Sequence, residues 1–174
     1  MDQVTRSDEV EKQTLLAVLS SQRRHVLGIL EGLDEVALRR PVLPSGWSCL
    51  GLVQHLARDD ERFWFSGTIA GDTEVVEALM NEIGSGVDGW AVDSATSANS
   101  VLEEYRVQCE VSDRVLAAVS VEDAPAWWPD ELFGDFRLES VREVLLHVIA
   151  ETATHAGHLD AAREILDGRT WLVL

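Results

Sequence analysis

The sequence predicts an all-α protein: a single domain, residues 1–174, folded as a four-helix bundle with long loops between its helices. Three observations lead to this prediction. Leu, Ala, Val and Glu dominate the composition, whereas Tyr and Phe number only one and four. Apolar residues recur at steps of three and four along several segments. The pattern Ser-x-x-Glu, which typically opens a helix, precedes two of these segments. Four long amphipathic helices favour a bundle, and its long connections make crossovers plausible.

The first expected helix covers about residues 7–33. Six apolar residues there keep the helical period: Leu15, Leu16, Leu19, Val26, Leu27 and Leu30. Gly32, followed by two prolines, marks the end of this helix.

A turn with the sequence PSGWS (44–48) precedes the second expected helix, which extends to about Gly71. Ser48 is its expected N-cap, because a serine oxygen can accept a hydrogen bond from the first helical turn. One broad apolar face of this helix is expected to be buried: Leu52, Val53, Leu56 and Phe63. After it, Asp72 is expected to cap a short helical segment, TEVVEALMNEI.

Residues 84–98 are rich in Gly, Ser and Asp and are predicted to form a loop. The capping box Ser100-x-x-Glu103 then predicts the start of the third long helix, which ends near Val119.

Residues 120–137 are predicted to form a long loop that contains Trp127 and Trp128. Loops of this length often cover a site, but we favour the interpretation that the two side chains anchor the loop to the bundle. A second capping box, Ser140-x-x-Glu143, starts the last long helix, which is expected to end with Gly168 at its C′ position.

The chain is strongly acidic, with 31 Asp and Glu against 14 Lys and Arg and a net charge of −17. This charge repels phosphate backbones and anionic membrane surfaces, so neither nucleic acid nor a membrane is an expected partner. The N-terminal residues contain no apolar signal core, and no apolar run approaches the ~18–20 residues of a membrane span. We therefore expect a cytoplasmic protein.

Several single residues have a plain structural interpretation. Cys49 and Cys109 do not make a disulfide framework and are expected to be small buried or half-buried side chains. His25 follows two arginines and is expected on the surface, whereas Trp64 is expected in the core.

Four polar residues of the last helix fall on one face. With about 100° per residue and His147 at zero, Glu151 lies near 40°, His155 near 80° and His158 near 20°. The neighbouring residues of this segment are apolar, so this polar stripe is expected to face the bundle interior. Buried polar groups must be hydrogen-bonded, paired or bound to metal.

Glu151 and His155 are one turn apart, a spacing that lets two side chains converge on one metal ion. His55 is the natural third ligand, because it too lies on an apolar helix surface. The alternative is a solvated helix pair or a satisfied ion pair. We expect His147 and His158 to hydrogen-bond the ligands or line a pocket, with a purely structural role about equally plausible.

Two blocks carry a resemblance to a known family: GWSCLGLVQHLARDDERFWF and LESVREVLLHVIAETATHAGHLDAAREILDG. With them, nearly the whole chain resembles the DinB-like superfamily, and more closely an actinobacterial branch of unknown function within it. The resemblance implies a four-helix bundle that holds a divalent metal through His55, Glu151 and His155. Many members have His at the position of Glu151, but the related mycothiol-dependent maleylpyruvate isomerase uses a His/Glu/His set.

Two histidines and one carboxylate leave coordination positions open, as catalytic zinc sites do. Zinc is the expected metal, with nickel, iron or manganese as alternatives. The resemblance implies an enzyme that activates a small thiol such as mycothiol, or water, for transfer to or hydrolysis of a small electrophile. The alternative is a non-catalytic, metal-stabilised bundle with a stress-related binding role. A homodimer is compatible with the resemblance.

A small thiol would need a binding group, and the helices near the motif offer Arg58, Arg62 and Arg163. We favour exposed, salt-bridged roles for these three arginines.

Overall fold

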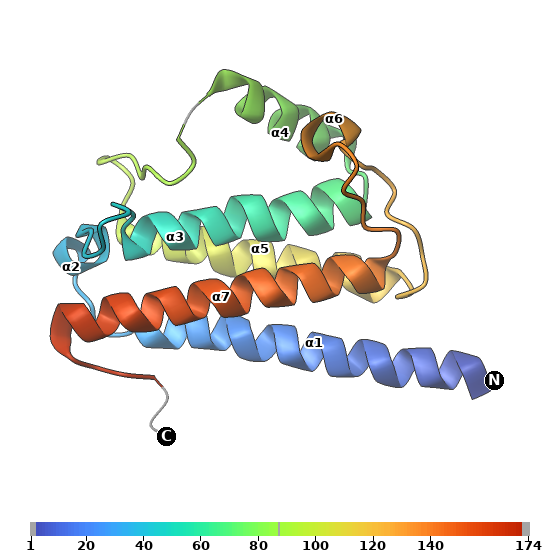
Figure 1. The fold of residues 1–174 in the computed structure, drawn as a ribbon, viewed down its shortest axis with the longest axis horizontal. Coiled ribbons are helices and arrows are strands. Elements are labelled where there is room, and N and C mark those ends of the chain that lie inside the picture. The colour runs from blue at the N-terminus through green and yellow to red at the C-terminus, as the bar shows by residue number, and fades with distance from the viewer. Residues whose placement is uncertain (1–2, 87, 172–174) are drawn as a thin grey trace.

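The computed structural model describes residues 3–86 and 88–171 and confirms the predicted all-α class (Figure 1). Four long helical segments lie side by side: α1 (Gln3–Leu30), α3 (Cys49–His55) with its continuation η1 (Leu56–Ile69), α5 (Ala98–Ala118) and α7 (Val141–Asp167). Three shorter helices connect or cover them: α2 (Glu35–Arg39), α4 (Thr73–Ser85) and α6 (Asp130–Phe133). Within the described ranges no helix is long and apolar enough to cross a membrane.

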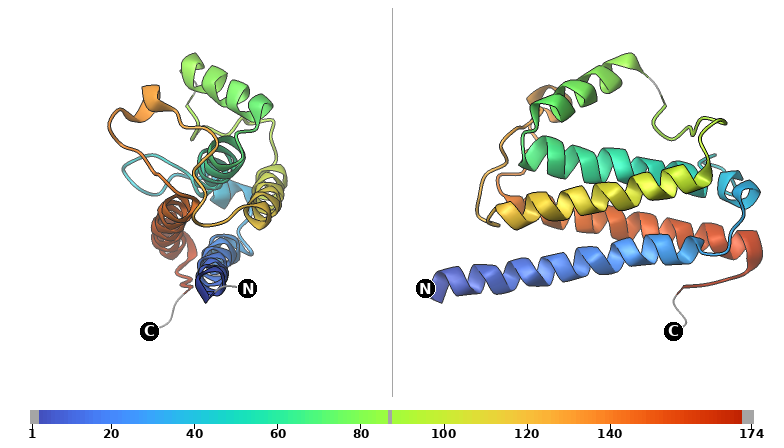
Figure 2. Two further views of the ribbon diagram at one scale, coloured as in Figure 1. Left: turned by 90° about the vertical axis from the view of Figure 1, so that its right-hand side faces the viewer. Right: turned by 180° about the vertical axis from the view of Figure 1, so that it is seen from behind.

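The long helices form two parallel pairs. Helices α1 and α7 run in one direction and pack closely together, while α3–η1 and α5 run in the opposite direction and pack closely together (Figures 1 and 2). Two parallel neighbours need a connection that returns along the length of the bundle. Residues 70–97, which include α4, make that return over the outside of η1 (Figure 2). The chain therefore does not follow a simple up-down order, as the long connections indicated.

Most of the expected helix ends are confirmed. The Ser48 side chain accepts a hydrogen bond from the Gly51 N–H at 3.0 Å, and Asp72 accepts from the N–H groups of the first turn of α4. Ser140 accepts from the Glu143 N–H at 3.3 Å. Gly168 follows α7 with φ of 77°, a left-handed conformation that favours glycine.

The predicted start of the third long helix is wrong. The helix begins at Ala98, and its N-cap is Ser97, whose oxygen accepts from the Ser100 N–H at 3.1 Å. Ser97 has the extended backbone that a cap needs, so Ser100 already lies inside the first turn. The first helix also ends three residues earlier than expected, at Leu30.

The segment η1 is a π-helix, in which N–H groups bond five residues back rather than four. The Ala70 N–H, for example, donates to the Phe65 carbonyl at 2.9 Å. This wider winding buries two successive acidic residues, Asp60 and Glu61, which are 4% and 1% exposed. In the sequence, Asp60 and Glu61 lie within a run of charged residues, which gave no indication that they are buried.

Glu61 is neutralised by Arg23 of α1, which is itself only 6% exposed. The guanidinium donates to both carboxylate oxygens of Glu61, at 2.7 and 2.6 Å, and to Asp113 of α5 at 2.7 Å. Burial is the largest single effect and would lower the pKa of Arg23, but the charge and hydrogen bonds of its partners, chiefly Glu61, together outweigh it and raise that pKa. This ion pair links α1 and η1 in the interior, and the exposed Asp113 adds a contact to α5.

The expectation that His25 lies on the surface is wrong. Its ring is half-buried between α1 and α7, where Nε2 lies 2.9 Å from Asp160 Oδ1. Trp64 is buried as expected. Cys49 and Cys109 are free, buried and half-buried respectively. Burial raises the pKa of Cys49 to about 11 and that of Cys109 further still, so neither thiol is an available nucleophile.

The buried ion pair gives a stability prediction. Glu61→Ala leaves the Arg23 charge in the interior with one exposed partner, so the free energy of unfolding is expected to fall by about 3–5 kcal/mol. The matched control is Glu103→Ala, which removes an exposed pair with Arg106 and is expected to cost less than about 1 kcal/mol. Urea denaturation followed by circular dichroism measures both. Equal, small losses would show that the buried pair does not organise the bundle.

Candidate functional site

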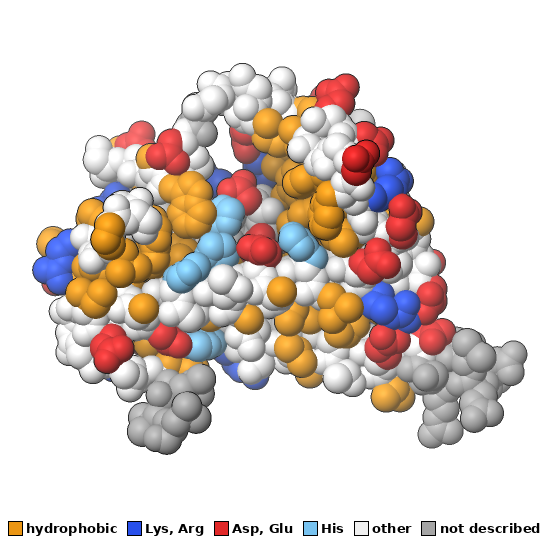
Figure 3. Space-filling view, viewed as in Figure 1, with side chains coloured by type: hydrophobic (Ala, Val, Ile, Leu, Met, Phe, Trp, Pro, Cys, Tyr) orange, Lys and Arg blue, Asp and Glu red, His pale blue; other side chains and the backbone are white. Residues whose placement is uncertain are grey.

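The structure brings the three predicted ligands together on one face of the bundle. His55 is the last residue of α3, while Glu151 and His155 come from α7. The rings of His55 and His155 meet edge to face, with centroids 5.0 Å apart, and His155 Nε2 lies 3.6 Å from Glu151 Oε2. In Figure 3, histidine side chains gather on this face beside acidic and hydrophobic side chains. We call His55, Glu151 and His155 the His–Glu cluster.

His55 is oriented by two neighbours that the sequence analysis did not identify. Its Nδ1 lies 2.7 Å from Asp59 Oδ2. An Nδ1–H that donates to this carboxylate leaves Nε2 with its lone pair free, the arrangement found in metal-binding histidines. The indole of Trp90 stacks on the ring, with centroids 4.2 Å apart and planes inclined by 17°. The His55 ring is therefore held in one orientation.

His158 and His147 lie on either side of the cluster. The expectation that the polar stripe faces the bundle interior is wrong in part, because His158 is exposed and the Glu151 side chain is 42% exposed. The Nδ1 of His158 lies 3.4 Å from His155 Nδ1. His147 is half-buried, and its ring meets Trp64 edge to face at 4.7 Å. Both positions are compatible with the expected roles as a ligand partner and a pocket residue, respectively.

Burial favours the neutral form of two histidines on this face, His155 and His147. Burial is the main cause that lowers the pKa of His155 to about 4, and the neighbouring His55 lowers it further against the opposing effect of Glu151. Burial also lowers the pKa of His147. Both imidazoles are therefore neutral near pH 7, the form in which histidine binds metal.

The donors do not yet converge on a single point. Among the residues that the structure describes, no group of three or more His, Cys, Asp or Glu side chains is close enough to hold a metal ion as it stands. The donor chemistry nevertheless fits a divalent cation, because two imidazoles and a carboxylate face one another at the surface of the bundle. In the described part of the chain, Glu151 makes no ion pair with lysine or arginine.

An aromatic cleft of about 360 Å³ opens beside the cluster. Its apolar walls come from η1, α4 and α6: Phe63, Trp64, Ile83, Leu132 and Phe133. Its polar lining includes His55, Glu151 and His147. The rings support one another, since Trp64 stacks on Phe133 with centroids 5.6 Å apart.

Asp60 also lines this cleft, and sequence analysis did not identify it. Its Oδ2 is buried and has no hydrogen-bond partner. Burial raises the pKa of Asp60 well above the ordinary range of aspartate, and the charges of Glu151, Glu61 and Asp59 raise it further. Buried polar atoms in proteins usually have a hydrogen-bond partner, so this oxygen is an exception.

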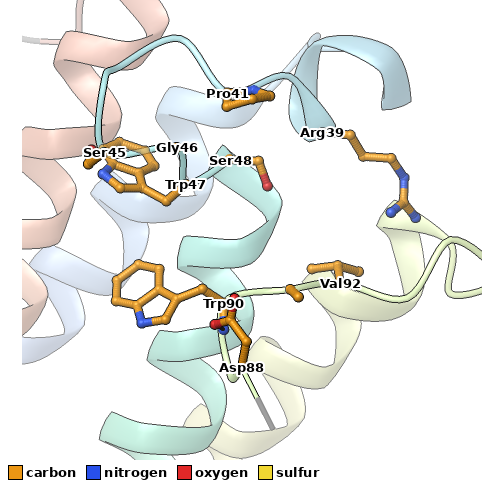
Figure 4. A pocket seen from close by; sticks show the side chains of 10 residues that line it. Arg39, Pro41, Ser45, Gly46, Trp47, Ser48, Asp88, Trp90 and Val92 are labelled. Carbon is orange, nitrogen blue, oxygen red and sulfur yellow. Dashed lines mark hydrogen bonds between the residues drawn. The ribbon is translucent and has the colours of Figure 1, made fainter.

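A second cavity, of about 590 Å³, lies on the other side of Trp90. We call it the tryptophan cavity, because Trp47 and Trp90 line it. Its polar lining includes Arg39, Ser45, Ser48 and Asp88. Figure 4 shows the two indoles extending to the same side, one above the other. Trp47 also approaches His158, with ring centroids 6.0 Å apart. The cavity thus adjoins the His–Glu cluster through both indoles.

Two residues of α3 position the loop that carries Trp90. The Gln54 amide donates to the carbonyls of Gly89 and Ala91, at 2.8 and 3.3 Å. Gly51 lets the loop approach closely, because a Cβ at this position would lie 2.3 Å from the Trp90 carbonyl oxygen. Neither contact has a local sequence signal, which explains why Trp90 was not identified as a site residue.

The three arginines considered as thiol-binding groups are all engaged. Arg58 pairs with Glu104 at 2.8 Å, and Arg62 pairs with Glu82. The expectation that Arg163 is exposed is wrong: it is buried, and it donates to two backbone carbonyls at the end of α1. Trp128 is buried against Trp64, and Trp127 donates its N–H to the Thr68 carbonyl, so the loop is anchored as favoured.

The tight approach at Gly51 gives a second prediction. Gly51→Ala forces the Trp90 loop away from α3 and is expected to lower the free energy of unfolding by about 1–3 kcal/mol, as overpacking does. Gly157 is an exposed position of α7, and nothing lies within 4 Å of an added Cβ there. Gly157→Ala is therefore expected to raise the free energy of unfolding by up to about 1 kcal/mol through helix propensity. Urea denaturation of both variants measures the difference. A stabilised Gly51→Ala would contradict the close contact.

The chain matches the model of the mycothiol-S-transferase family over residues 14–168. The matched region covers most of the chain and contains all three residues of the His–Glu cluster. Searches of curated proteins and of solved structures gave no significant match. The family match also agrees with the DinB-like resemblance of the two sequence blocks. The chain belongs to the mycothiol-S-transferase family of DinB-like proteins.

Proposed function

We propose that this protein is a metal-dependent thiol transferase that joins a small thiol of the mycothiol type to a small electrophile. The observation that carries the proposal is the meeting of His55 with Glu151 and His155 on one face, inside the region that matches the family. A bound divalent metal, with zinc as the first candidate, would supply a Lewis acid that lowers the pKa of a thiol or of water.

The protein residues have distinct tasks in this proposal. His55, Glu151 and His155 would hold the metal. Asp59 orients the ring of His55 and leaves its Nε2 free to bind. Trp90 covers one face of His55 and keeps water from that side.

The two cavities beside the cluster support a reaction between two substrates. The tryptophan cavity is the larger and combines two indole faces with serine, aspartate and arginine side chains. This lining suits the polar, hydroxyl-bearing body of a thiol cofactor. The aromatic cleft opens on the opposite side of His55 and leaves room for the second reactant. Both reactants would then meet at the cluster.

The alternative is a non-catalytic bundle that a metal stabilises. Arg39 lines the tryptophan cavity but pairs with Glu35, and Arg58 and Arg62 also pair with glutamates. The engagement of these three arginines favours this alternative. Under it, His158 would complete the coordination of the metal and no thiol would gain access. The two proposals differ in whether a thiol reaches the metal.

Metal content tests the ligand set. The protein purified without an affinity tag or chelator is expected to contain about one divalent metal per chain. Native mass spectrometry of the intact protein or elemental mass spectrometry measures this content. His55→Ala and His155→Ala are expected to lose the metal because each removes one of three donors. His25→Ala is the control, since this histidine pairs with Asp160 outside the cluster. No metal in the unsubstituted protein, even after zinc, nickel or iron is added, would overturn the proposal.

Thiol access separates the enzyme from the alternative. In protein substituted with cobalt, the visible absorption spectrum is expected to change when mycothiol is added, because the thiol enters the open coordination position. The same protein with zinc is expected to conjugate mycothiol to an electrophile, and a chelator is expected to abolish the reaction. A spectrum that thiol leaves unchanged, together with no conjugation, would favour the non-catalytic bundle.

A further inference from the structure

Apolar side chains that face solvent surround the aromatic cleft. Ile83 and Leu132 line it, and they are 45% and 37% exposed. Phe136 is 46% exposed and lies beside Phe133, with ring centroids 5.9 Å apart. In Figure 3, hydrophobic side chains gather beside the histidines on this face. Exposed apolar side chains that gather around a hollow typically mark a site where an apolar ligand binds.

Phe133 holds the apolar wall of the cleft in place. Its ring stacks on Trp64 with planes inclined by 14° and meets Phe63 edge to face with centroids 6.0 Å apart. A further ring contact joins it to the buried Trp128. These contacts fix the ring orientations before a ligand arrives, so little side-chain entropy is lost on binding. Such a wall favours a ring in the ligand, in stacked or edge-to-face geometry.

The same cleft reaches the His–Glu cluster. His55 and Glu151 belong to its lining together with the apolar wall. Its volume of about 360 Å³ suits a small molecule. A substrate whose apolar ring lies against Phe63 and Phe133 therefore has its reactive end close to the cluster.

The two cavities beside the cluster differ in the surface that they present. The surface of the aromatic cleft is mostly apolar, although several polar residues line it. The surface of the tryptophan cavity is polar and apolar in about equal parts, with Arg39 and Asp88 among its lining residues. Removing an apolar group from water is favoured in proportion to the apolar area that is buried. An apolar ring is therefore expected to enter the aromatic cleft rather than the tryptophan cavity.

We propose that the aromatic cleft is the electrophile subsite and that it selects electrophiles that carry an apolar ring. This inference rests on the proposed thiol transfer. Ile83 of α4, with Leu132 and Phe133 of α6, sets the preference, so the selectivity lies in helices outside the four-helix bundle. For an epoxide, the thiolate sulfur attacks the terminal carbon. A C–S bond forms, the C–O bond to that carbon breaks, and the oxygen keeps the electron pair and takes up a proton in place of the one that the thiol lost.

Two neutral epoxides that differ by one phenyl group test the selectivity. The compound 1,2-epoxy-4-phenylbutane is compared with 1,2-epoxybutane, each with mycothiol and the zinc-loaded protein. Each kcat/KM is divided by the rate constant of the uncatalysed reaction. The phenyl compound is expected to be favoured by about tenfold or more, because the cleft removes its ring from water. A ratio near one, or in favour of the smaller epoxide, would overturn the inference.

Polar substitutions locate the preference in the cleft. Ile83→Gln and Leu132→Gln, combined in one chain, replace two exposed apolar side chains of its lining, so the core is left undisturbed. The preference for the phenyl compound is expected to fall by about threefold or more, because less apolar surface covers the ring. Ile165→Gln is the control, because this exposed residue near the end of α7 lies outside the cleft. An unchanged ratio in the double variant would refute the assignment of the subsite.

Binding without reaction separates this inference from the proposed function. The unreactive 4-phenyl-1,2-butanediol and 1,2-butanediol are titrated against the purified protein by nuclear magnetic resonance, without thiol. The phenyl compound is expected to bind about tenfold more tightly or better. It is expected to shift the indole N–H signal of Trp64, which lines the cleft, rather than that of Trp47, which lines the tryptophan cavity.

The outcomes of this titration are distinct. Equal binding of the two diols, or a shift at Trp47 alone, would overturn the cleft assignment. Preferential binding at Trp64 without conjugation would support the cleft assignment and count against thiol transfer. Conjugation without that binding preference would count against the cleft alone.

Discussion

The buried ion pair between Arg23 and Glu61 is the constraint on which the rest of the structure depends. It joins α1 to η1 at a point from which water is excluded, so η1 cannot rotate without leaving a charge unpaired. Arg23 also pairs with the exposed Asp113 of α5. The π-helical winding then determines the orientation of the neighbouring residue, Asp60. With Glu61 turned toward Arg23, Asp60 is turned toward α7 and the aromatic cleft. One acidic residue is satisfied by the fold, and the adjacent one keeps a buried oxygen without a hydrogen-bond partner.

Much of the fold follows from local sequence patterns. Helical periodicity locates the four long helices, and Ser48, Asp72 and Gly168 mark ends that the structure confirms. The patterns fail where two residues compete for one role. Ser97 and Ser100 can both cap a helix, and backbone conformation rather than residue type selects Ser97. The π-helical winding of η1 depends on packing between helices, so no local pattern indicates it.

The candidate site is only half predictable from the sequence. The spacing of Glu151 and His155 places both on one face of α7. His55 is the expected partner from its place on an apolar helix surface, and the family resemblance implies the same residue. Asp59 could have been found, because it lies one turn beyond His55 on the same helix. Trp90 and Asp60 could not. Trp90 reaches His55 through contacts between segments distant in the sequence, and the orientation of Asp60 follows from η1.

The attachment of the Trp90 loop has a mechanical consequence. Gln54 holds the backbone on both sides of Trp90, and the next residue, His55, lies under its indole. The His55 ring and the Trp90 indole that covers it are thus held by adjacent residues of one helix, His55 itself and Gln54. When thermal motion shifts that helix within the bundle, both groups travel as a single body. The distance between the His55 ring and the Trp90 indole therefore stays the same when the helices move relative to one another. The distance from the His55 ring to His155 on α7 changes with that motion.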